Sequence, residues 1–511
     1  MSEVALMNTY EQRCPISVRV VVAGLVMLIV SGCMVGPNYH PPQMTAPPEW
    51  YGVGQKMINQ PSVTTAQPAE LTQWWCQFKD PTLAALVEEA VKVNLDLKLA
   101  EASLRQARAA RGVTLGGLWP AVSGTATYQK MYEKTHTLPS PSVENPNLFQ
   151  AGFDAVWELD VFGGLRRNVE SASASVQAAF EGIRNAQVSL VAEVALNYIQ
   201  LRGFQQEIVV AKKNLEAQQH TAEITRKLWK VGFNSALDVA NADANVATTE
   251  AQIPVFETSA QQSIYALSIL LARPPADLLE RLSPTANLPQ VPAQVPAGLP
   301  SDLLRRRPDI KQAEAQLHAA TAQIGVAVAQ LFPQFSLTGS ASGQSSLLHT
   351  WWTEASRSLG FGPSVTWQIF QGGAIISNVH VQEALRDQAF ITYQKTVLAA
   401  FQDVENALIA FAKEQEHRKA LHEAVVANRK AVDLSLLLYT EGQIPFLNVL
   451  VAQEALYASE NALVQSETNI VTDLIALYKA LGGGWESMPS SAQGTSSSPT
   501  NVAAENNPDK K

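Results

Sequence analysis

The sequence has few of the residue patterns on which catalytic and metal sites depend. Its 511 residues include only three cysteines, which excludes a disulfide framework, and no H-E-x-x-H, G-x-S-x-G, P-loop or Cys-x-x-Cys motif occurs. Of the eight histidines, His417 and His422 are five residues apart, which is the wrong spacing for one helix face. We therefore expect no catalytic residues, no metal site and no enzymatic activity.

Charged side chains are also scarce, at 16% of the chain, and the net charge is −9. A nucleic-acid-binding protein would show a basic face or stripe, so nucleic acid is excluded as a partner. The exception is the triplet Arg305-Arg306-Arg307 in "LPSDLLRRRPDI" (299–310). We expect these arginines to pair with acidic neighbours or to lie in water. Ser301 or Asp302 is expected as the N-cap of a short helix, and Pro308 in the first turn of the next helix.

The N-terminus carries an apolar run, Val20 to Val30, that is too short for a membrane-spanning helix. Arginines precede the run, and small residues followed by Cys33 end it. This pattern resembles a bacterial lipoprotein signal, in which the cysteine thiol is acylated and becomes the new N-terminus. An ordinary secretory signal that contains a cysteine is the alternative. Met34, in place of an aspartate, favours the outer membrane, and the lipid on Cys33 is the only cofactor expected.

The rest of the chain is a duplicated unit. "NLDLKLAEASLRQARAA" matches "RPDIKQAEAQLHAATAQ" at an offset of 213 residues, from Asp96 to Asp309, and the later parts match at 210, from Gly232 to Gly442. The second copy lacks the three extra residues that the first has before Trp157. The expected organisation is a signal peptide at 1–32, an extended lipid-anchored segment at 33–75, a first repeat at 76–288, a Pro-rich linker at 289–300, a second repeat at 301–485 and a disordered tail at 486–511.

Four short segments alternate apolar and polar residues, as β-strands with two different faces do. They are 121–128, 149–159, 335–343 and 359–369. Their length and pattern are those of transmembrane strands, and no other sheet is predicted on which a soluble sandwich could form. Four strands cannot close a barrel, and an open edge is not tolerated in lipid. The chain must therefore associate, as two copies with eight strands or three copies with twelve.

Each pair of strands is followed by a very long helical stretch. From about Gly164 to Val231, apolar residues recur in steps of three and four, and the second copy repeats this pattern without a proline. Some 68 residues at about 1.5 Å each make a helix roughly 100 Å long, which is longer than a compact bundle allows. Narrow apolar seams predict coiled coils. Turns at 231–239 and 441–449 make each unit a helical hairpin.

Four motifs together resemble one family, the TolC/OprM-like outer-membrane factors of tripartite efflux pumps, in their lipoprotein branch. They are "LPSDLLRRRPDIKQAEAQL", "IGVAVAQLFPQFSLTGSAS", "WQIFQGG" and "LYKALGGGW", and the resemblance runs from Cys33 to Trp485. It implies a mainly α-helical chain with four strands, which forms a homotrimer. The trimer has a twelve-stranded barrel in the outer membrane and a coiled-coil tunnel in the periplasm. A periplasmic adaptor (membrane fusion) protein would join it to an inner-membrane pump of the RND class.

The resemblance also implies a gate at the helical tips. The two positions that carry aspartates in TolC fall on Asn448 and Val451, so this gate is expected to be more apolar, lined by Leu447 and Val451; alternatively, Val451 packs in the coiled-coil seam. Acidic character is expected on the first hairpin at Asp238, beside Asn241. The residues expected to contact the adaptor at the tips are Val231, Gly232, Glu441 and Gly442.

The function expected from the residues and the resemblance is passive conduction of small molecules that a pump expels. A type I secretion channel is an alternative within the same fold. A lipoprotein scaffold that conducts nothing is a further alternative, but such a stalk needs no lipid-facing apolar sheet. The expected location is the outer membrane, with a lipid anchor and a large periplasmic portion.

Overall fold

The computed structural model describes residues 34–52, 62–65, 71–130 and 147–486. The signal peptide and Cys33 lie outside these residues, and so does the predicted tail except for Glu486. The chain divides into two units. The sheet unit comprises Met1–Ala46, Lys98–Ile183 and Pro308–Ala399, and the hairpin unit comprises Pro47–Leu97, Arg184–Arg307 and Ala400–Lys511.

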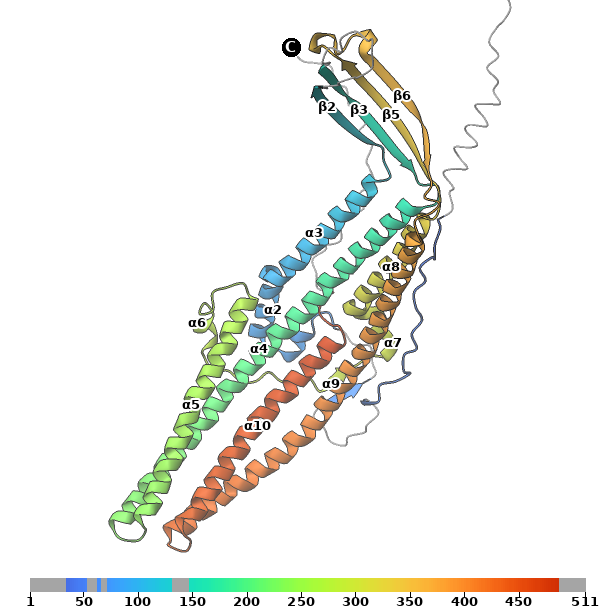
Figure 1. Cartoon of the computed structure of the whole chain (residues 1–511). Coiled ribbons are helices and arrows are strands. Elements are labelled where there is room, and N and C mark those ends of the chain that lie inside the picture. The colour runs from blue at the N-terminus through green and yellow to red at the C-terminus, as the bar shows by residue number, and fades with distance from the viewer. Residues whose placement is uncertain (1–33, 53–61, 66–70, 131–146, 487–511) are drawn as a thin grey trace, which may run out of the picture. The chain divides into compact units, whose positions relative to one another are not determined.

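The same order of elements occurs twice along the chain (Figure 1). The first series is α2 (Pro81–Val93), α3 (Leu95–Gly116), β2 (Ala121–Lys130), β3 (Asn147–Leu159), α4 (Gly164–Lys230) and α5 (Ala236–Leu270). The second is α7 (Pro300–Arg306), α8 (Pro308–Ala329), β5 (Gln334–Ser345), β6 (Arg357–Thr366), α9 (Ala374–Thr440) and α10 (Phe446–Ala480). The smaller elements are β1 (Val63–Thr65), η2 (Trp74–Phe78), α6 (Leu279–Leu282), β4 (Gln294–Pro296), η3 (Leu348–Thr350) and η4 (Glu354–Ser356).

Two equivalent hydrogen bonds show that the copies also share their local geometry. The indole of Trp157 donates to the carbonyl of Leu118 at 3.0 Å, and the indole of Trp367 donates to the carbonyl of Leu331 at 3.1 Å. The two acceptors, Leu118 and Leu331, each precede a strand pair, and they are separated by the 213-residue offset found in the sequence. Both bonds fasten the end of a strand pair to the helix before it.

None of the helices in the described residues is both long and apolar enough to cross a membrane.

The sheet unit contains one antiparallel sheet with the strand order β2-β3-β5-β6. Its register brings the apolar positions of all four strands to one face: Leu159 lies opposite Phe335, which lies opposite Val365. The polar positions share the other face, as in the row formed by Asp154 and Ser340. Because directly opposite residues in a ladder point to the same side, the alternation predicted for single strands becomes a property of the whole sheet.

The last strand is shorter than the sequence predicts. It was expected over 359–369, whereas β6 ends at Thr366, which pairs with Gln334. The residue before Gln334 is Pro333, which has no N–H with which to continue the ladder. Trp367 to Ile369 therefore leave the sheet. The other three strands include the predicted residues and extend beyond them by two or three residues.

The two long helices α4 and α9 have 67 residues each, which corresponds to about 100 Å of helix. Of the seam residues that the spacing predicts, Val194 and Val404 are fully buried, whereas Phe204 and Leu421 are half-buried. Each helix ends in a glycine with positive φ, Gly232 at +81° and Gly442 at +75°. Glycine adopts this conformation without a steric penalty, so the chain can reverse there and return as α5 or α10.

The described residues that directly follow Cys33 are held by a buried arginine within the sheet unit. The side chain of Arg167 is only 2% exposed, and it donates to the carbonyls of Val35 and Gly36 and, at 2.7 Å, to Asn38 Oδ1. The Val35 amide in turn donates to the carbonyl of Phe162. A guanidinium can remain buried here because backbone and side-chain oxygens take up its donors.

The arginine triplet is used for structure. The short helix α7 begins at Pro300, so Leu299 precedes it and neither Ser301 nor Asp302 is its N-cap, contrary to expectation; proline at N1 already supplies the helical φ. Pro308 begins α8, as predicted. Arg306 and Arg307 pair with Glu486 and Asp403, as expected, and Arg305 is exposed.

The terminal motif "LYKALGGGW" packs the end of α10 within the hairpin unit. Tyr478 stacks on Trp74 with ring centroids 5.1 Å apart. A Cβ on Gly483 would lie 2.9 Å from the Leu71 side chain, and Gln187 donates to the carbonyl of Gly484 at 2.9 Å. Small residues are needed there because the backbone lies directly against the aromatic side chains.

Gly482 provides a stability test. Its φ is +72°, and a Cβ there would lie 3.0 Å from Arg307 Cγ. Gly482→Ala is expected to destabilise the fold by about 1–2 kcal/mol, because non-glycine residues pay for the left-handed conformation. The change would be measured as a lower midpoint of the helical circular-dichroism transition in detergent. Ala272→Gly is the matched control, since Ala272 is the first-copy counterpart and also has a positive φ, +53°. Its midpoint should stay the same or rise; a lower midpoint for the control alone would contradict the explanation.

Candidate functional site

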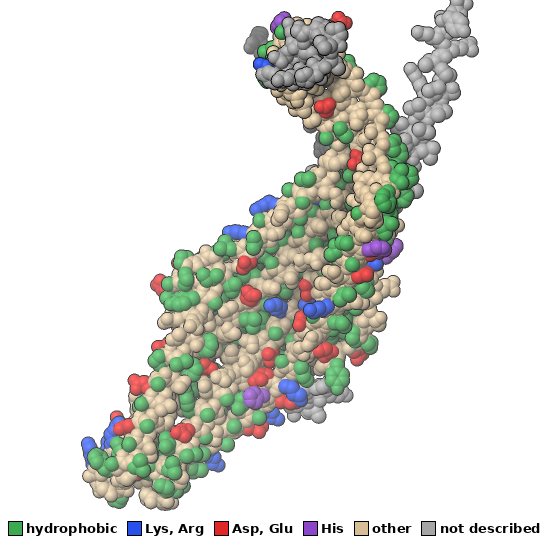
Figure 2. Space-filling view, in the orientation of Figure 1, with side chains coloured by type: hydrophobic (Ala, Val, Ile, Leu, Met, Phe, Trp, Pro, Cys, Tyr) green, Lys and Arg blue, Asp and Glu red, His purple; other side chains and the backbone are tan. Residues whose placement is uncertain are grey.

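The sheet presents large apolar side chains that nothing in the described chain covers. Phe361 is 94% exposed, Leu359 83% and Phe153 64%. They lie on the same face, because Phe153 pairs with Ala341 and Ala341 with Leu359. Few charged side chains lie over the visible surface of the sheet (Figure 2). Large exposed apolar side chains that share one face of a sheet mark contact with lipid or with a partner protein.

The two edges of the sheet are open. Within the described residues β2 pairs only with β3, and β6 pairs only with β5. In water an open edge invites aggregation, and in lipid it leaves N–H and C=O groups unsatisfied. The sheet is thus incomplete, and its two edges need further strands with which to form hydrogen bonds.

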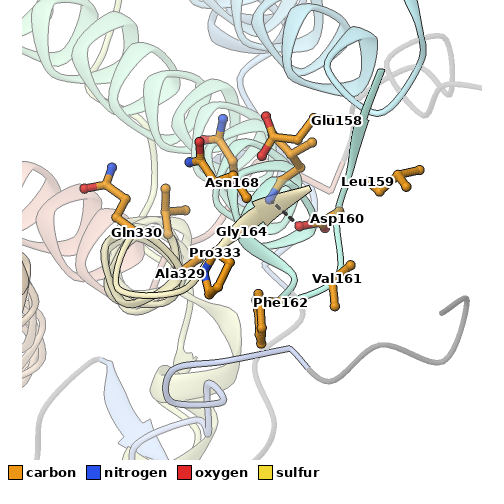
Figure 3. Close-up of a pocket in the computed structure, with 13 residues that line it drawn as sticks. Glu158, Leu159, Asp160, Val161, Phe162, Gly164, Asn168, Ala329, Gln330 and Pro333 are labelled. Atoms are coloured by element: carbon orange, nitrogen blue, oxygen red, sulfur yellow. Dashed lines mark hydrogen bonds between the residues drawn. The ribbon is translucent and has the colours of Figure 1, made fainter. Parts of the chain in front are cut away.

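A polar pocket of about 190 Å³ lies where the strands meet the helices of the sheet unit (Figure 3). Asp160 closes one side: its carboxylate accepts from the amides of Leu165 and Arg166 and pairs with the Arg166 guanidinium at 3.0 Å. Glu158 and Asn168 also line the pocket. A carboxylate at a helix start satisfies the free N–H groups, so Asp160 fixes the change of direction from β3 to α4.

This pocket offers no chemistry beyond hydrogen bonding. The polar side chains around it are carboxylates and carboxamides, without a nucleophile or a general base paired with one. Across the described residues, no group of three or more histidine, cysteine, aspartate or glutamate side chains is placed to hold a metal ion.

The predicted adaptor-contact residues are exposed at the hairpin turns. Val231 is 68% exposed, and Gly232, Glu441 and Gly442 are exposed as well. The two turns have the same backbone hydrogen bonds: Gly232 donates to Trp229, and Gly442 donates to Tyr439. The tips thus offer backbone groups, apolar side chains and the Glu441 carboxylate to whatever binds there.

The predicted gate residues of the second hairpin share one exposed side of α10. Leu447 is 58% exposed and Val451, one turn later, is 56% exposed; Asn448 is exposed too. The buried seam positions are Phe446 and Val449, at 2% and 0% exposure. Within the described chain, Val451 therefore does not pack in the seam, which was the alternative placement.

The first-hairpin residues are placed differently. Asp238 is half-buried, and its Oδ2 accepts from both the amide and the hydroxyl of Ser235 at 3.0 Å. This capping box satisfies the start of α5. Asn241 is half-buried as well. On α10 the N-cap is Pro445, which has no side chain able to make such a bond. The acidic group expected at the gate is thus engaged in a helix cap.

Sequence reasoning missed a polar seam between the two hairpins. Near the tips, Asn234 Nδ2 donates to the Tyr439 hydroxyl at 2.5 Å, and that hydroxyl lies 3.4 Å from Thr225 Oγ1. Further along, Gln453 donates to Thr221 Oγ1 at 2.8 Å. The only available signal was the polar residues at seam positions of α4, where a coiled coil usually has apolar ones.

The seam also holds ionisable groups. The buried Glu460 accepts from Asn214 at 2.7 Å and from Arg429 at 2.5 Å. Elsewhere on α10, burial and, as a smaller cause, the nearby Glu414 carboxylate together raise the pKa of Asp473 to about 6. Between pH 3.8 and about 6, the Asp473 carboxyl is protonated in the folded state and ionised in the unfolded chain. The free energy of unfolding therefore falls as the pH rises through this range.

Comparison with known proteins gives a consistent result. The model of the family "Outer membrane efflux protein" matches residues 86–273 and 299–483, once in each copy of the repeat. The chain is 32% identical over 466 residues to the "Solvent efflux pump outer membrane protein SrpC" of Pseudomonas putida, covering 90% of this chain and 97% of the relative. It is also 32% identical over 470 residues to "Nodulation protein T" of Rhizobium leguminosarum bv. viciae, covering 91% and 93%.

A solved structure agrees over a similar length. The outer-membrane channel OprN superimposes with a TM-score of 0.82 at 35% identity, covering 89% of this chain and all of OprN. This similarity confirms the predicted fold class and the family resemblance seen in the motifs. The chain belongs to the outer membrane efflux protein family, and it is an outer-membrane channel protein with a periplasmic portion.

Proposed function

We propose that this chain is the outer-membrane duct of a tripartite efflux system and conducts small molecules passively. The observation that supports this most is the sheet: four strands share one exposed apolar face and leave two open edges, in a family of efflux channels. A non-conducting scaffold needs no such face. The energy for transport would come from a pump, because the described residues form the side of a channel and include no catalytic group.

A homotrimer is the assembly proposed to close the sheet. Three copies bring twelve strands together, and each β2 edge then pairs with the β6 edge of a neighbouring copy. The apolar face would contact outer-membrane lipid and the polar face the water-filled interior, as in other bacterial barrels. The partners proposed at the tips are a periplasmic adaptor protein and, through it, an inner-membrane pump of the RND class. The similarity to an efflux-pump component supports this assembly.

The exposed side of α10 is proposed as the gate lining, with Leu447, Asn448 and Val451 in each copy. The apolar rings formed by Leu447 and Val451 can close a water path by drying it, without the charge that an aspartate ring supplies. The capping role of Asp238 leaves the α10 residues as the principal lining.

The segmentation of the chain is proposed as the sequence predicts it. The repeats span 76–288 and 301–485 around the linker 289–300, after the segment 33–75, and the tail is 486–511. Lipidation of Cys33 fits the fixed position of the residues that follow it, because Arg167 holds Val35 and Gly36.

The face of the sheet in contact with lipid can be tested with charge. Phe361→Arg puts a cation on the apolar face of β6 and is expected to cost up to about 2–4 kcal/mol of membrane stability. We expect a clearly lower yield of assembled trimer in outer-membrane fractions. Ser364→Arg, on the polar face of the same strand, is the control and should assemble normally. Equal yields for the two variants would mean that the apolar face does not contact lipid.

The gate lining can be tested with a charged ring. Val451→Asp would place three carboxylates around the path, and carboxylate rings bind cations. Channels of this variant in planar bilayers should be blocked by multivalent cations at roughly tenfold lower concentration than wild-type channels. Val451→Asn, similar in size and uncharged, should resemble the wild type. A Val451→Asp channel with unchanged sensitivity would remove this residue from the lining.

The lipid anchor can be tested by labelling. In cells fed labelled palmitate, the Cys33→Ser protein is expected to lose the label completely, because no other thiol follows the signal segment directly. Cys76→Ser is the matched control, since Cys76 is a free, exposed cysteine, and it should keep the label. Label retained after Cys33→Ser would contradict lipidation at this residue.

A further inference from the structure

Arg307, the last arginine of the "RRRPD" motif, has a counterpart in the first copy that makes only one of its two contacts. Arg307 occupies the position of Asn94, 213 residues earlier. Asn94 donates to the carbonyl of Leu270 at 2.9 Å, and Arg307 donates to the carbonyl of Ala480 at 3.1 Å. These acceptors are equivalent and lie at the C-terminal ends of α5 and α10. Both side chains thus satisfy a carbonyl that the helix end leaves free.

Arg307 makes a second contact that Asn94 cannot make. Its guanidinium pairs with Asp403 on α9, at 3.1 Å from Nη1 and 3.2 Å from Nη2. The equivalent residue on α4 is Glu193, which is also acidic, but the neutral Asn94 gives it no cation. Both copies have a carboxylate at this position, but only the second copy has the arginine that pairs with it. The root of the second hairpin is therefore tied across α9 and α10 by an ion pair, and that of the first is not.

The backbone next to Arg307 is adapted to the longer side chain. Gly482 lies so close to it that a Cβ would be 3.0 Å from Arg307 Cγ. In the first copy, the equivalent positions hold Ala272 and the shorter Asn94. Arg306 adds a second tie, to Glu486, which also accepts from the amide of Gly484. The side chain of Arg307 is only 12% exposed, whereas its partner Asp403 is 53% exposed, so the ion pair lies at the edge of the packed root.

Small changes at this root are magnified at the tip. The helix α10 has 35 residues, or roughly 50 Å of length, so a tilt of about 5° at one end moves the other by about 4 Å. Leu447 and Val451 lie in the first two turns of α10, at the end away from Arg307. We propose that Arg307 is a positioning residue for the gate: its pair with Asp403 braces the root of the second hairpin and holds the tip in its resting position. This inference rests on the proposed channel function.

The test uses full-length channels reconstituted in planar bilayers, with the fraction of time spent open as the readout. Arg307→Asn installs the first-copy residue, which can still satisfy the Ala480 carbonyl but cannot pair with Asp403. Asp403→Asn keeps Arg307 and removes only its charge partner, at a residue that is 53% exposed. Asp403→Glu keeps the carboxylate. Glu193→Gln is the matched control, because the same position in the first copy faces no such arginine.

We expect Arg307→Asn and Asp403→Asn each to raise open probability about two- to fivefold, as loss of a partly exposed ion pair can do to a two-state equilibrium. The double variant should be no more open than either single one, since both remove one interaction. Asp403→Glu and Glu193→Gln should behave like the wild type. The thermal midpoint of trimer dissociation, measured in parallel, should stay unchanged in Asp403→Asn.

Two failures are distinguishable. If wild-type channels open but Arg307→Asn and Asp403→Asn open no more often, Arg307 only caps α10 and the inference is overturned. The same holds if Glu193→Gln has an equal effect. If no channel opens, the wild type included, the proposed conduction itself fails.

Discussion

The structure depends on one constraint: backbone polar groups in lipid must find partners within the protein. Four strands per chain meet this constraint only in part, because β2 and β6 each keep one unpaired edge. The exposed apolar side chains of the same sheet can be stable only against lipid or another chain. The sheet of a single chain is therefore incomplete, and further copies of the chain are needed to close it.

The duplication gives the molecule two similar hairpins that have diverged in their side chains. The backbone features are kept: positive-φ glycines at both turns, tryptophan hydrogen bonds at both strand ends and a capped C-terminus on each return helix. The side chains differ where the two hairpins need different properties. The first has a capping box at its tip and a neutral asparagine at its root; the second has a proline at its tip and an arginine at its root.

The contact between the two hairpins near their tips is partly apolar and partly polar. Tyr439, Phe446 and Val449 of the second hairpin pack with Ala222 and Ala242 of the first, while Gln453 donates a hydrogen bond to Thr221. The hydrogen-bonded groups can exchange their partners for water more readily than the packed apolar side chains can. The hydrogen bond from Asn214 of α4 to Glu460 of α10 also joins the two hairpins.

The sequence by itself determined the repeat, the order of elements, the two 67-residue helices and the two faces of each strand, because these follow from period and spacing along the chain. It also determined that four strands could not suffice. Only the tertiary structure decided which side chains and strands become partners. It showed that the ladder ends at the pair of Gln334 and Thr366, next to Pro333. It also showed that Asp238 accepts hydrogen bonds from Ser235 and that Arg307 contacts both Ala480 and Asp403. A side chain's partner is set by what packs beside it, and local pattern does not contain that information.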